Sequence, residues 1–461
     1  MNEDIFQGYK GKALEVLKKY NVQVWDDADI ETTRGHFSGK ILPRAENTDS
    51  LHIVLKLSTG YNIGVHVSTI ITMSSRRLAQ PVFKIPEKEI PYTKGLPRIK
   101  LLGTGGTIAS RLDYRTGAVI PAFSPSELYA SVPELTEICN METEEVLAVF
   151  SENMSSKHYI ILAKKIEEAV KSGIDGIVIS HGTDTLQHTG AALTFMCQNL
   201  PVPIVLVGSQ RSSDRPSSDA ALNLMHAATA AAHGDIAEVL ICMAGTTSDD
   251  YGLLHKATRA RKMHSSYRSA FRSINDTPMA KITRNNIELI KKEYNKKDKN
   301  RTIKIIPTFD DRVTMLYYYP GMKPDILEAV IDNGYKGIVW VGAGLGHINK
   351  EMYPAVEKAH TAGIHQYMTL QTIWGYVNLF VYDTGRDIMA RGIIPCGNML
   401  PEVAYIKLGW ALGQTDDAEE VKRIMLTPIN DEITQREPYN AYLVYQGGIE
   451  EVEEFIRKVR K

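Results

Sequence analysis

Residues Ile99 to Ser110 read Ile-Lys-Leu-Leu-Gly-Thr-Gly-Gly-Thr-Ile-Ala-Ser, and this stretch decides the fold. An apolar run that ends in three clustered glycines predicts a buried parallel strand followed by a tight loop. Thr107 then lies at the carboxyl end of the strand, where open α/β sheets bind their ligands. A hydroxyl at that position can act as a nucleophile if a neighbouring group takes its proton.

From Arg98 onward, short apolar runs alternate with amphipathic segments of helical length. The predicted strands of this part are Ile99–Leu102, Gly176–Ser180, Ile204–Val207 and Val239–Ala244, and the predicted helices are Lys157–Lys171, Thr189–Leu200 and Ser218–His233. A second part repeats the rhythm, with strands at Thr314–Tyr318 and Gly337–Val341 and a helix at Asn349–Ala362. Strands that alternate with helices predict βαβ units and parallel sheets.

The first 85 residues follow a different pattern. An amphipathic helix is predicted over Asp4–Tyr20, and four short strands are predicted at Val22–Trp25, His36–Leu42, Leu51–Leu57 and Tyr61–Val67. Several short strands separated by turn residues favour a small β-barrel or sandwich. The predicted fold is therefore an α/β core of two parallel-sheet domains preceded by a small N-terminal β-barrel domain.

Changes in composition divide the chain into six segments. We predict a β-rich domain over residues 1–85, a proline-rich linker over 86–97, an α/β domain over 98–290, a connection over 291–310, a second α/β domain over 311–429 and a strand–helix extension over 430–461. The extension contains a predicted strand at Ala441–Tyr445 and a predicted helix at Glu450–Arg460. The basic run Lys291–Arg301 is interpreted as a solvated surface segment.

The bulk composition excludes several classes of function. The 461 residues carry a formal net charge of −1, with 43% hydrophobic and 23% charged residues, so nothing attracts the whole chain to nucleic acid or to a membrane. The start of the chain does not resemble a signal peptide, and no apolar run is long enough to span a bilayer. Four scattered cysteines indicate reduced, buried thiols in a cytoplasmic protein, and no ligand spacing predicts a metal site.

Two further clusters carry groups that could serve Thr107. Residues 177–185 read Ile-Val-Ile-Ser-His-Gly-Thr-Asp-Thr, so a second apolar strand ends in hydroxyls and a carboxylate. These side chains suit either catalysis or the capping of the next helix. Residues 254–266 are basic, and a lysine that is withdrawn from water there can act as a base. His181 lacks a serine–histidine–carboxylate set, which favours a structural role.

The glycine cluster has an alternative interpretation as a dinucleotide-binding loop. Its spacing argues against this, because Ile108 occupies the position of the third glycine of the fingerprint, and no Gly-Lys-Ser/Thr follows.

The motifs together resemble those of the asparaginase/glutaminase family of bacterial type. Residues 104–110 and 181–185 are similar to its two signature motifs, and the segments 208–223 and 401–413 also resemble the family. The N-terminal module, with residues 39–44 and 57–64, is similar to that of a narrower family, the archaeal GatD family of glutamyl-tRNA(Gln) amidotransferases.

The resemblance implies a catalytic set. Thr107 matches the nucleophilic threonine of the family, Thr183 and Asp184 match its second threonine and its aspartate, and Lys262 matches its lysine. Lys256 is the second choice for the lysine.

The resemblance also implies a substrate-binding set. Ser151 matches the serine that binds the substrate carboxylate, and Asp184 is expected at the α-ammonium group. Glu152 departs from the glutamine of many free asparaginases, and its carboxylate is expected to hold the α-ammonium group more strongly. Gly106 and Gly182 contribute the backbone of the binding turns, and Tyr114 is the candidate for the tyrosine of a mobile loop.

The same resemblance implies a function. The chain is expected to release ammonia from glutamine without a cofactor, while a partner protein, GatE, uses ATP and Mg²⁺ to convert Glu-tRNA(Gln) to Gln-tRNA(Gln). The partner is expected to make most tRNA contacts, and a homodimer of this chain to form the core of a heterotetramer. Two alternatives stay open: a free-standing L-asparaginase with an accessory domain, and a catalytically silent scaffold or RNA-binding protein.

Overall fold

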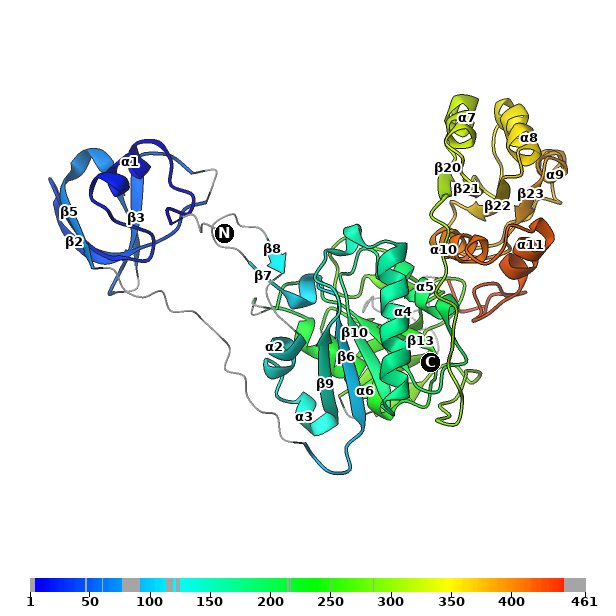
Figure 1. The fold of residues 1–461 in the computed structure, drawn as a ribbon, viewed down its shortest axis with the longest axis horizontal. Coiled ribbons are helices and arrows are strands. Elements are labelled where there is room, and N and C mark those ends of the chain that lie inside the picture. The colour runs from blue at the N-terminus through cyan, green and yellow to red at the C-terminus, as the bar shows by residue number, and fades with distance from the viewer. Residues whose placement is uncertain are drawn as a thin grey trace, which may run out of the picture. The chain divides into compact units, whose positions relative to one another are not determined.

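The computed structural model describes residues 5–45, 48–59, 61–76, 92–112, 119–121, 125–213, 215, 217–248, 250–284 and 286–442 (Figure 1). The chain divides into two compact units, which are described separately. The N-terminal unit comprises Met1–Glu87 and Arg111–Ile120, and the larger unit comprises Lys88–Ser110 and Pro121–Lys461.

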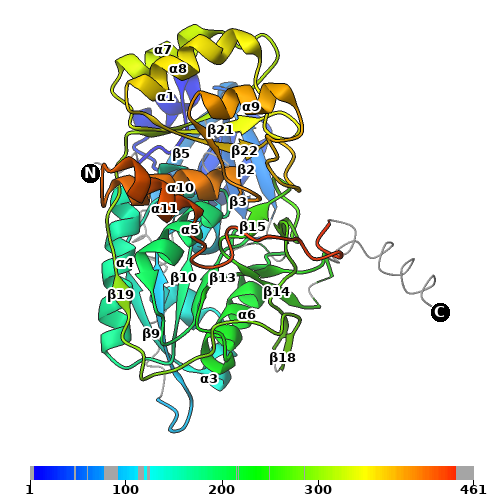
Figure 2. The same ribbon diagram turned by 90° about the vertical axis from the view of Figure 1, so that its right-hand side faces the viewer.

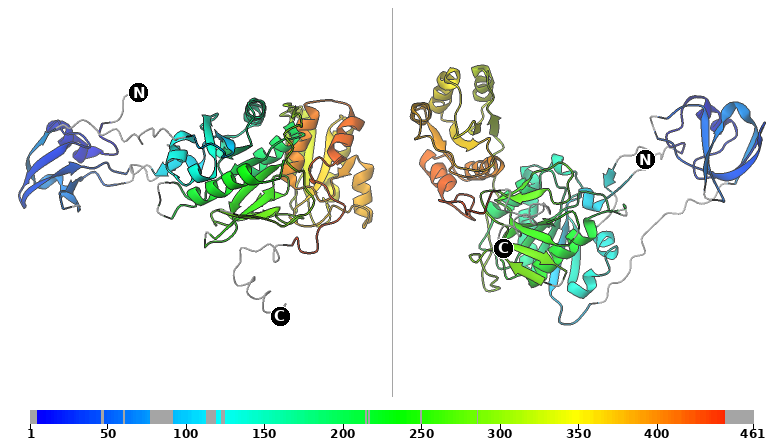
Figure 3. Two further views of the ribbon diagram at one scale, coloured as in Figure 1. Left: turned by 90° about the horizontal axis from the view of Figure 1, so that it is seen from below. Right: turned by 180° about the vertical axis from the view of Figure 1, so that it is seen from behind.

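The N-terminal unit is a curled five-stranded antiparallel sheet with the strand order β4-β3-β2-β1-β5 (Figure 3). Its elements are α1 (Gly11–Lys19), β1 (Asp27–Thr32), β2 (Gly35–Ile41), β3 (His52–Leu57), β4 (Asn62–His66) and β5 (Ile70–Arg76). Leu17 of α1 is fully buried together with Ile30, Ile53 and Leu55 of the sheet. This unit therefore has its own hydrophobic core, and the expectation of a small β-rich domain at the N-terminus is confirmed; its strands pair antiparallel.

Two predicted elements of this unit are wrong. The helix begins at Gly11 and not at Asp4, because the chain turns at Gln7 and Gly8, whose positive φ angles of 29° and 82° interrupt a right-handed helix. Val22–Trp25 is not a strand, since Trp25 has a φ of 76°. The alternating apolar residues of that segment are buried in an irregular turn, and the first strand, β1, follows it.

The larger unit contains an eight-stranded mixed sheet with the order β18-β17-β14-β13-β12-β10-β6-β9. Five neighbouring strands are parallel: β9 (Asn140–Glu145), β6 (Arg98–Gly103), β10 (Gly176–Ser180), β12 (Ile204–Val207) and β13 (Val239–Ala244). Four of them were predicted, and the polar strand β9 was not. Every residue of β10 is buried, with Ile177 and Ile179 packed in one core and Val178 in another. Such continuous burial is typical of a parallel strand covered on both faces.

Helices cover both faces of this sheet. The core that holds Ile177 also contains residues of α4 (Ser156–Lys171) and α5 (Leu186–Met196), whereas the core that holds Val178 contains residues of α6 (Ala220–His233). The short elements α2 (Pro125–Ala130), α3 (Leu135–Ile138), β7 (Ser110–Leu112) and β8 (Val119–Pro121) lie between β6 and β9 in the chain.

The other edge of the sheet is antiparallel, which the sequence analysis did not predict. It consists of β14 (Gly252–Lys256), β17 (Ala280–Thr283) and β18 (Asn286–Leu289). Two small ladders also belong to this unit: β15 (Ala260–Lys262) with β16 (Phe271–Ser273), and β11 (Cys197–Gln198) with β19 (Lys304–Ile305).

A four-stranded parallel sheet follows, with the order β20-β21-β22-β23, as predicted for the second α/β part (Figure 2). Its elements are β20 (Val313–Tyr317), α7 (Pro324–Asp332), β21 (Gly337–Gly342), α8 (Tyr353–Thr361), β22 (His365–Leu370), α9 (Asp383–Ala390), β23 (Ile393–Pro395), α10 (Pro401–Leu412) and α11 (Ala418–Leu426). The rings of Phe195 on α5 and Trp410 on α10 stack with centroids 5.7 Å apart, so one core joins the two sheets.

The chain after α11 ties the same two parts together, and we call residues 427–434 the strap (Figure 2). Lys407 of α10 donates to the carbonyl oxygen of Thr427 at 2.7 Å and pairs with Glu432, and both ends of that ion pair are fully buried. From the other side, Thr258 donates to the carbonyl oxygen of Asn430 at 2.8 Å. The strap is therefore held by polar groups of both parts, from helix α10 and from the turn after β14.

All four cysteines are buried and free. Burial raises the pKa of the Cys139, Cys242 and Cys396 thiols to about 12, and it raises the pKa of Cys197 as well. Their reduced, buried state agrees with the expectation from their spacing.

The remaining segments are described in part. In the basic run 291–301, exposed and half-buried residues alternate, and Lys291 pairs with Asp276 at 2.7 Å. The linker up to residue 91 and the C-terminal extension from residue 443 lie outside the described residues. Within the part of the chain that is described, no helix combines the length and the apolarity that a membrane span requires.

Candidate active site

The two signature loops start side by side because their strands are parallel neighbours. Gly103, the last residue of β6, pairs with Ser180, the last residue of β10. Just beyond them, Thr104 donates from its hydroxyl to the carbonyl oxygen of Ser180 at 2.8 Å and from its backbone N–H at 3.1 Å. Both loops therefore leave the carboxyl edge of the sheet together, as the predicted strands require.

Glycine is required where the loops touch. Gly106 has a φ of 81°, and a Cβ atom there would lie 2.2 Å from the backbone nitrogen of Gly182. A Cβ atom on Gly182 would in turn lie 2.7 Å from the Oγ atom of Ser151. The loops of Thr107 and Thr183 thus meet backbone to backbone, and the side chain of Ser151 packs against Gly182, where a larger residue would collide with it.

Lys262 joins the second signature motif to the basic segment. Its Nζ atom donates to Thr183 Oγ1 and to Asp184 Oδ1, both at 2.8 Å. The lysine side chain is only 9% exposed and Thr183 is buried, whereas the Asp184 side chain is 68% exposed. An amine that lies against a buried hydroxyl and beside a carboxylate is placed to exchange a proton with that hydroxyl.

The alternative role considered for Thr183 and Asp184 was to cap the following helix. The N-cap residue of α5 is Thr185, and no side chain caps the helix there. The hydroxyl of Thr185 donates instead to the carbonyl oxygen of Ser151 at 2.6 Å, across 34 residues of sequence. Thr183 and Asp184 are occupied by Lys262, so the geometry favours a role in the site.

The predicted binding residues lie beside these groups. Ser151 begins a single helical turn, Ser151–Asn153, and is buried against Gly182, while the neighbouring Glu152 is exposed. Thr107 begins another such turn, Thr107–Ala109, and is half-buried. Tyr114 lies outside the described residues.

His181 is part of the scaffold of this site. It is fully buried, with Nδ1 2.7 Å from the carbonyl oxygen of Gly182 and Nε2 2.9 Å from Thr189 Oγ1. Burial lowers the pKa of His181 to about 4. A neutral ring that donates from Nδ1 and accepts at Nε2 satisfies both contacts, which agrees with the structural role favoured from the sequence.

Lys256, the second choice for the catalytic lysine, lies elsewhere. Its Nζ atom pairs with Glu238 Oε2 at 3.0 Å and with Asp431 Oδ2 at 2.7 Å, and its side chain is 4% exposed. Lys256 ends β14, six residues before Lys262, so the intervening turn carries the two lysines to different surroundings. Among the described residues, no group of three or more His, Cys, Asp or Glu side chains is arranged to hold a metal ion.

Sequence reasoning assigned no role to a loop that braces Thr107. The carboxylate of Asp219, at the start of α6, accepts hydrogen bonds from the backbone N–H groups of Gln210 and Arg211 at 3.0 and 3.1 Å. Ser213, in the same loop, donates to the carbonyl oxygen of Ile108. An aspartate in a polar loop is the signal of such a brace, because its carboxylate can accept from backbone N–H groups of the same loop.

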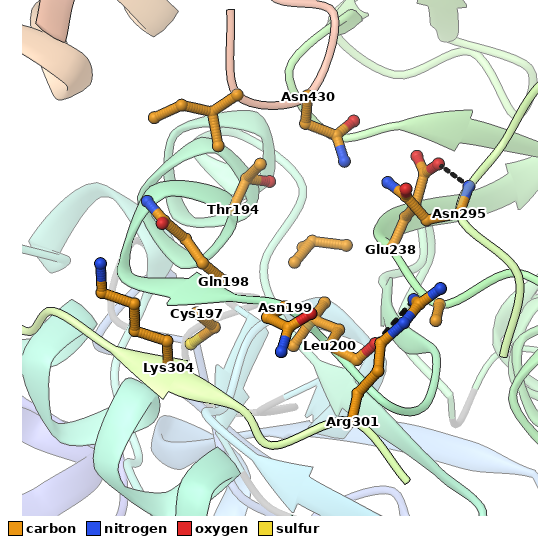
Figure 4. A pocket seen from close by; sticks show the side chains of 13 residues that line it. Thr194, Cys197, Gln198, Asn199, Leu200, Glu238, Asn295, Arg301, Lys304 and Asn430 are labelled. Atoms are coloured by element: carbon orange, nitrogen blue, oxygen red, sulfur yellow. Dashed lines mark hydrogen bonds between the residues drawn. The ribbon is translucent and has the colours of Figure 1, made fainter. Parts of the chain in front are cut away.

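A cavity of about 440 Å³ lies away from these residues (Figure 4). Side chains of Thr194, Gln198, Glu238, Asn295, Arg301, Lys304 and Asn430 line it. None of the predicted site residues is among its lining residues. We therefore assign it no part in the chemistry of the signature motifs.

Comparison with known families first shows to which class of protein the core of the chain belongs. Residues 98–295 match the family model "Asparaginase, N-terminal", and residues 312–425 match the model "Glutaminase/Asparaginase C-terminal domain". The thermostable L-asparaginase from Thermococcus kodakarensis is similar over 73% of this chain and 99% of its own, with 33% identity and a TM-score of 0.67. L-asparaginase I from Vibrio cholerae shows 28% identity and a TM-score of 0.65 over 74% of this chain and 99% of its own. The core is thus of the asparaginase type.

The N-terminal domain and the full-length relatives narrow this class. Residues 22–74 match the model "GatD N-terminal domain". The GatD protein of the glutamyl-tRNA(Gln) amidotransferase of Pyrococcus furiosus is 45% identical over 437 residues, which cover 93% of this chain and 99% of the relative. The GatD protein of Thermococcus kodakarensis is 44% identical, with 94% and 100% covered. The chain belongs to the GatD family of glutamyl-tRNA(Gln) amidotransferases.

Proposed function

We propose that this chain is the glutaminase component of a tRNA-dependent amidotransferase. It hydrolyses glutamine and supplies ammonia for the conversion of Glu-tRNA(Gln) to Gln-tRNA(Gln). The observation that carries the proposal is the position of Lys262 Nζ, 2.8 Å from both Thr183 Oγ1 and Asp184 Oδ1, beside the loop of Thr107. Similarity to GatD relatives over nearly their whole length supports the tRNA-dependent role.

In the proposed mechanism the Thr107 oxygen attacks the carbon of the glutamine side-chain amide. The hydroxyl proton is taken up by the set of Lys262, Thr183 and Asp184, and a proton is returned to the departing nitrogen as ammonia leaves. Water then hydrolyses the γ-glutamyl ester on Thr107 and regenerates the hydroxyl. Backbone N–H groups of the glycine loops stabilise the oxyanion, an effect worth about 3 kcal/mol per donor.

Substrate recognition uses the groups around the same loops. In this proposal Ser151 binds the α-carboxylate of glutamine, and Asp184 with Glu152 holds the α-ammonium group. The exposure of Asp184 and Glu152 supports this, because carboxylates open to solvent can receive a charged ligand. Gly106 and Gly182 bring the backbone close to the amide carbon.

The second half of the reaction belongs to a partner in this proposal. The partner, GatE, uses ATP and Mg²⁺ to activate Glu-tRNA(Gln), and it makes most of the tRNA contacts. A homodimer of this chain forms the core of a cytoplasmic heterotetramer. This chain needs no cofactor of its own.

Ammonia release from the purified chain tests the proposal. Glutamine and asparagine are supplied in turn, with and without GatE and Glu-tRNA(Gln), to the wild type and to Thr107→Ala. We expect glutamine hydrolysis to rise when the partner and charged tRNA are present, and to be lost in Thr107→Ala. Full activity of Thr107→Ala would overturn the assignment of the nucleophile.

A free-standing L-asparaginase is the second candidate, because the similar solved structures are L-asparaginases. One methylene group separates the two substrates, and it discriminates by only about 1–3 kcal/mol. Rapid turnover of asparagine that does not respond to GatE or to tRNA would favour this candidate over the amidotransferase.

A further inference from the structure

We propose that the strap is a positioning element for the catalytic lysine, and that Thr258 and Arg259 are the positioning residues through which it acts on Lys262. The inference rests on the proposed function, since it concerns the lysine assigned to the chemistry there. It adds a requirement that the signature motifs do not show: the site depends on a chain segment that follows Lys262 by more than 160 residues.

Lys262 has only a short element of its own. It is the last residue of β15, which spans three residues, and its register is set by three pairs with β16. A ladder this short stabilises itself poorly, since isolated two-stranded ribbons are marginal in water. The position of the lysine therefore depends on what holds the turn between β14 and β15.

The strap holds that turn at two consecutive residues. The hydroxyl of Thr258 donates to the carbonyl oxygen of Asn430 at 2.8 Å. The Nε atom of Arg259 donates to the carbonyl oxygen of Asp431 at 2.6 Å. Both side chains are buried, at 1% and 0% exposure, so these hydrogen bonds have no competition from bulk water.

Arg259 also ties the turn to the loop before α10. Its guanidinium donates to the backbone oxygen of Asn398 at 2.9 Å and to the Asn398 side-chain oxygen at 3.1 Å. The side-chain amide of Asn398 donates in turn to Thr434 of the strap at 2.8 Å. The arginine therefore lies inside a closed polar network, and its planar donors fix a direction as well as a distance.

The strap is itself held by several contacts where it meets the turn. Asp431 has a φ of 55°, a left-handed conformation that needs surrounding contacts to persist. Its carboxylate forms an ion pair with Lys256, at the start of the same turn, with 2.7 Å between Oδ2 and Nζ. The Glu432 carboxylate accepts from the backbone N–H groups of Ile429 and Asn430 at 2.8–3.0 Å and pairs with Lys407.

These contacts lead from the strap to Thr183. The turn 256–259 is fixed at Lys256, Thr258 and Arg259, and Lys262 is three residues further along the chain. A displacement of about 1 Å is enough to cost about 10²-fold in rate when a reacting group depends on alignment. Loss of the strap contacts is therefore expected to reduce kcat more than it reduces substrate binding.

The test compares four variants of the full-length chain. Thr258→Val and Arg259→Met remove the donors to the strap, and Thr258→Ser keeps the hydroxyl as the conservative variant. Leu327→Ala is the stability control, because Leu327 is fully buried on α7 in a separate core. Each protein is assayed for glutamine hydrolysis, thermal unfolding and the acetylation rate of Lys262. That rate is measured by mass spectrometry against Lys422, whose side chain is 43% exposed.

We expect Arg259→Met to lower kcat by about 10²-fold with a smaller change in KM, and to speed acetylation of Lys262 several-fold. Thr258→Val should act in the same direction, and Thr258→Ser should restore both measurements. Leu327→Ala should lower the melting temperature and leave Lys262 acetylation unchanged.

The outcome that overturns the proposal is an unchanged Lys262 acetylation rate in folded Arg259→Met and Thr258→Val. Equal changes in these variants and in Leu327→Ala would also overturn it, because they would reflect general loosening. The acetylation rate does not depend on turnover, so a wild type without glutaminase activity would contradict the proposed function alone.

Discussion

Lys262 is the side chain that brings two distant parts of the chain together at the atomic scale. It reaches Thr183 from 79 positions further along the sequence. The residues alone did not show which lysine of the basic segment acts in the site. The family resemblance indicated Lys262. A sequence cannot give this distance, because it depends on how β15 is held by the turn, the strap and β16.

Replacement of Lys262 tests its role as a base. Lys262→Met should lower kcat for glutamine by about 10²–10⁴-fold, the usual contribution of a general base. Lys262→Arg should not restore the rate, because arginine keeps the positive charge but cannot be deprotonated in proteins. Ammonia release is the measurement, with Lys422→Met on the surface as the control. Wild-type activity of Lys262→Arg would contradict the role of Lys262 as a general base. It would show that the site needs only a positive charge at this position.

His181 gives a prediction for stability against pH. Burial lowers the pKa of His181 to about 4 from its ordinary 6.5. Below pH 6.5, His181 therefore binds a proton in the unfolded chain but stays neutral in the folded chain. The free energy of unfolding should therefore fall as the pH drops from about 6.5 towards 4. Denaturant titrations at several pH values should show a shallower decline for His181→Asn than for the wild type.

Buried His255, whose pKa burial lowers to about 3, contributes in the same direction and keeps some slope in every variant. A decline in His181→Asn as steep as in the wild type would show that His181 is not the source.

At the scale of elements, most of the parallel strands were predicted, whereas β9, β22, β23 and the antiparallel edge were not. Strand β10 is buried along its whole length, so its apolar run is visible in the sequence. Strand β14 ends in His255 and Lys256, whose burial depends on Ser273, Glu238 and Asp431 far along the chain. Polar residues that find distant partners break the apolar pattern on which strand prediction rests.

The glycine loops permit a matched comparison. Gly106 and Gly173 have similar φ angles of 81° and 78°, but a Cβ atom meets Gly182 only at Gly106, and nothing lies within 4 Å at Gly173. Gly173→Ala should cost about 1–2 kcal/mol of stability from backbone conformation alone. Gly106→Ala should cost more and abolish ammonia release, because the two signature loops must separate.

Urea unfolding and the ammonia assay together measure this difference. Equal losses of stability in the two variants would contradict the close approach of the loops at Gly106. An active Gly106→Ala would show that the loops tolerate separation.

At the scale of the whole molecule, the chain contains two units with separate cores. The sequence analysis anticipated a β-rich domain ahead of an α/β core, because the spacing of turns changes from one part to the other. It did not anticipate the strap, since a segment of irregular structure carries no periodic signal. The strap residues Asp431 and Glu432 show their role only through partners that lie more than a hundred residues away or on another helix.

The separate cores predict separate unfolding. Leu55 is fully buried in the core of the N-terminal unit, and Leu55→Ala should destabilise that unit by about 2–5 kcal/mol. Calorimetry should show one transition shifted to lower temperature and the transition of the larger unit in place. Leu327→Ala should do the reverse. A single transition that moves in both variants would mean that the two units unfold together.

The four buried thiols have a practical consequence. Only thiolates react quickly with maleimides and iodoacetamides, and burial that raises the pKa of these cysteines keeps them protonated and out of reach. The native cysteines should therefore react little with labelling reagents. A single cysteine placed on each unit could carry a fluorophore or a spin label, and distances between the two units could be followed in solution without first removing any native cysteine.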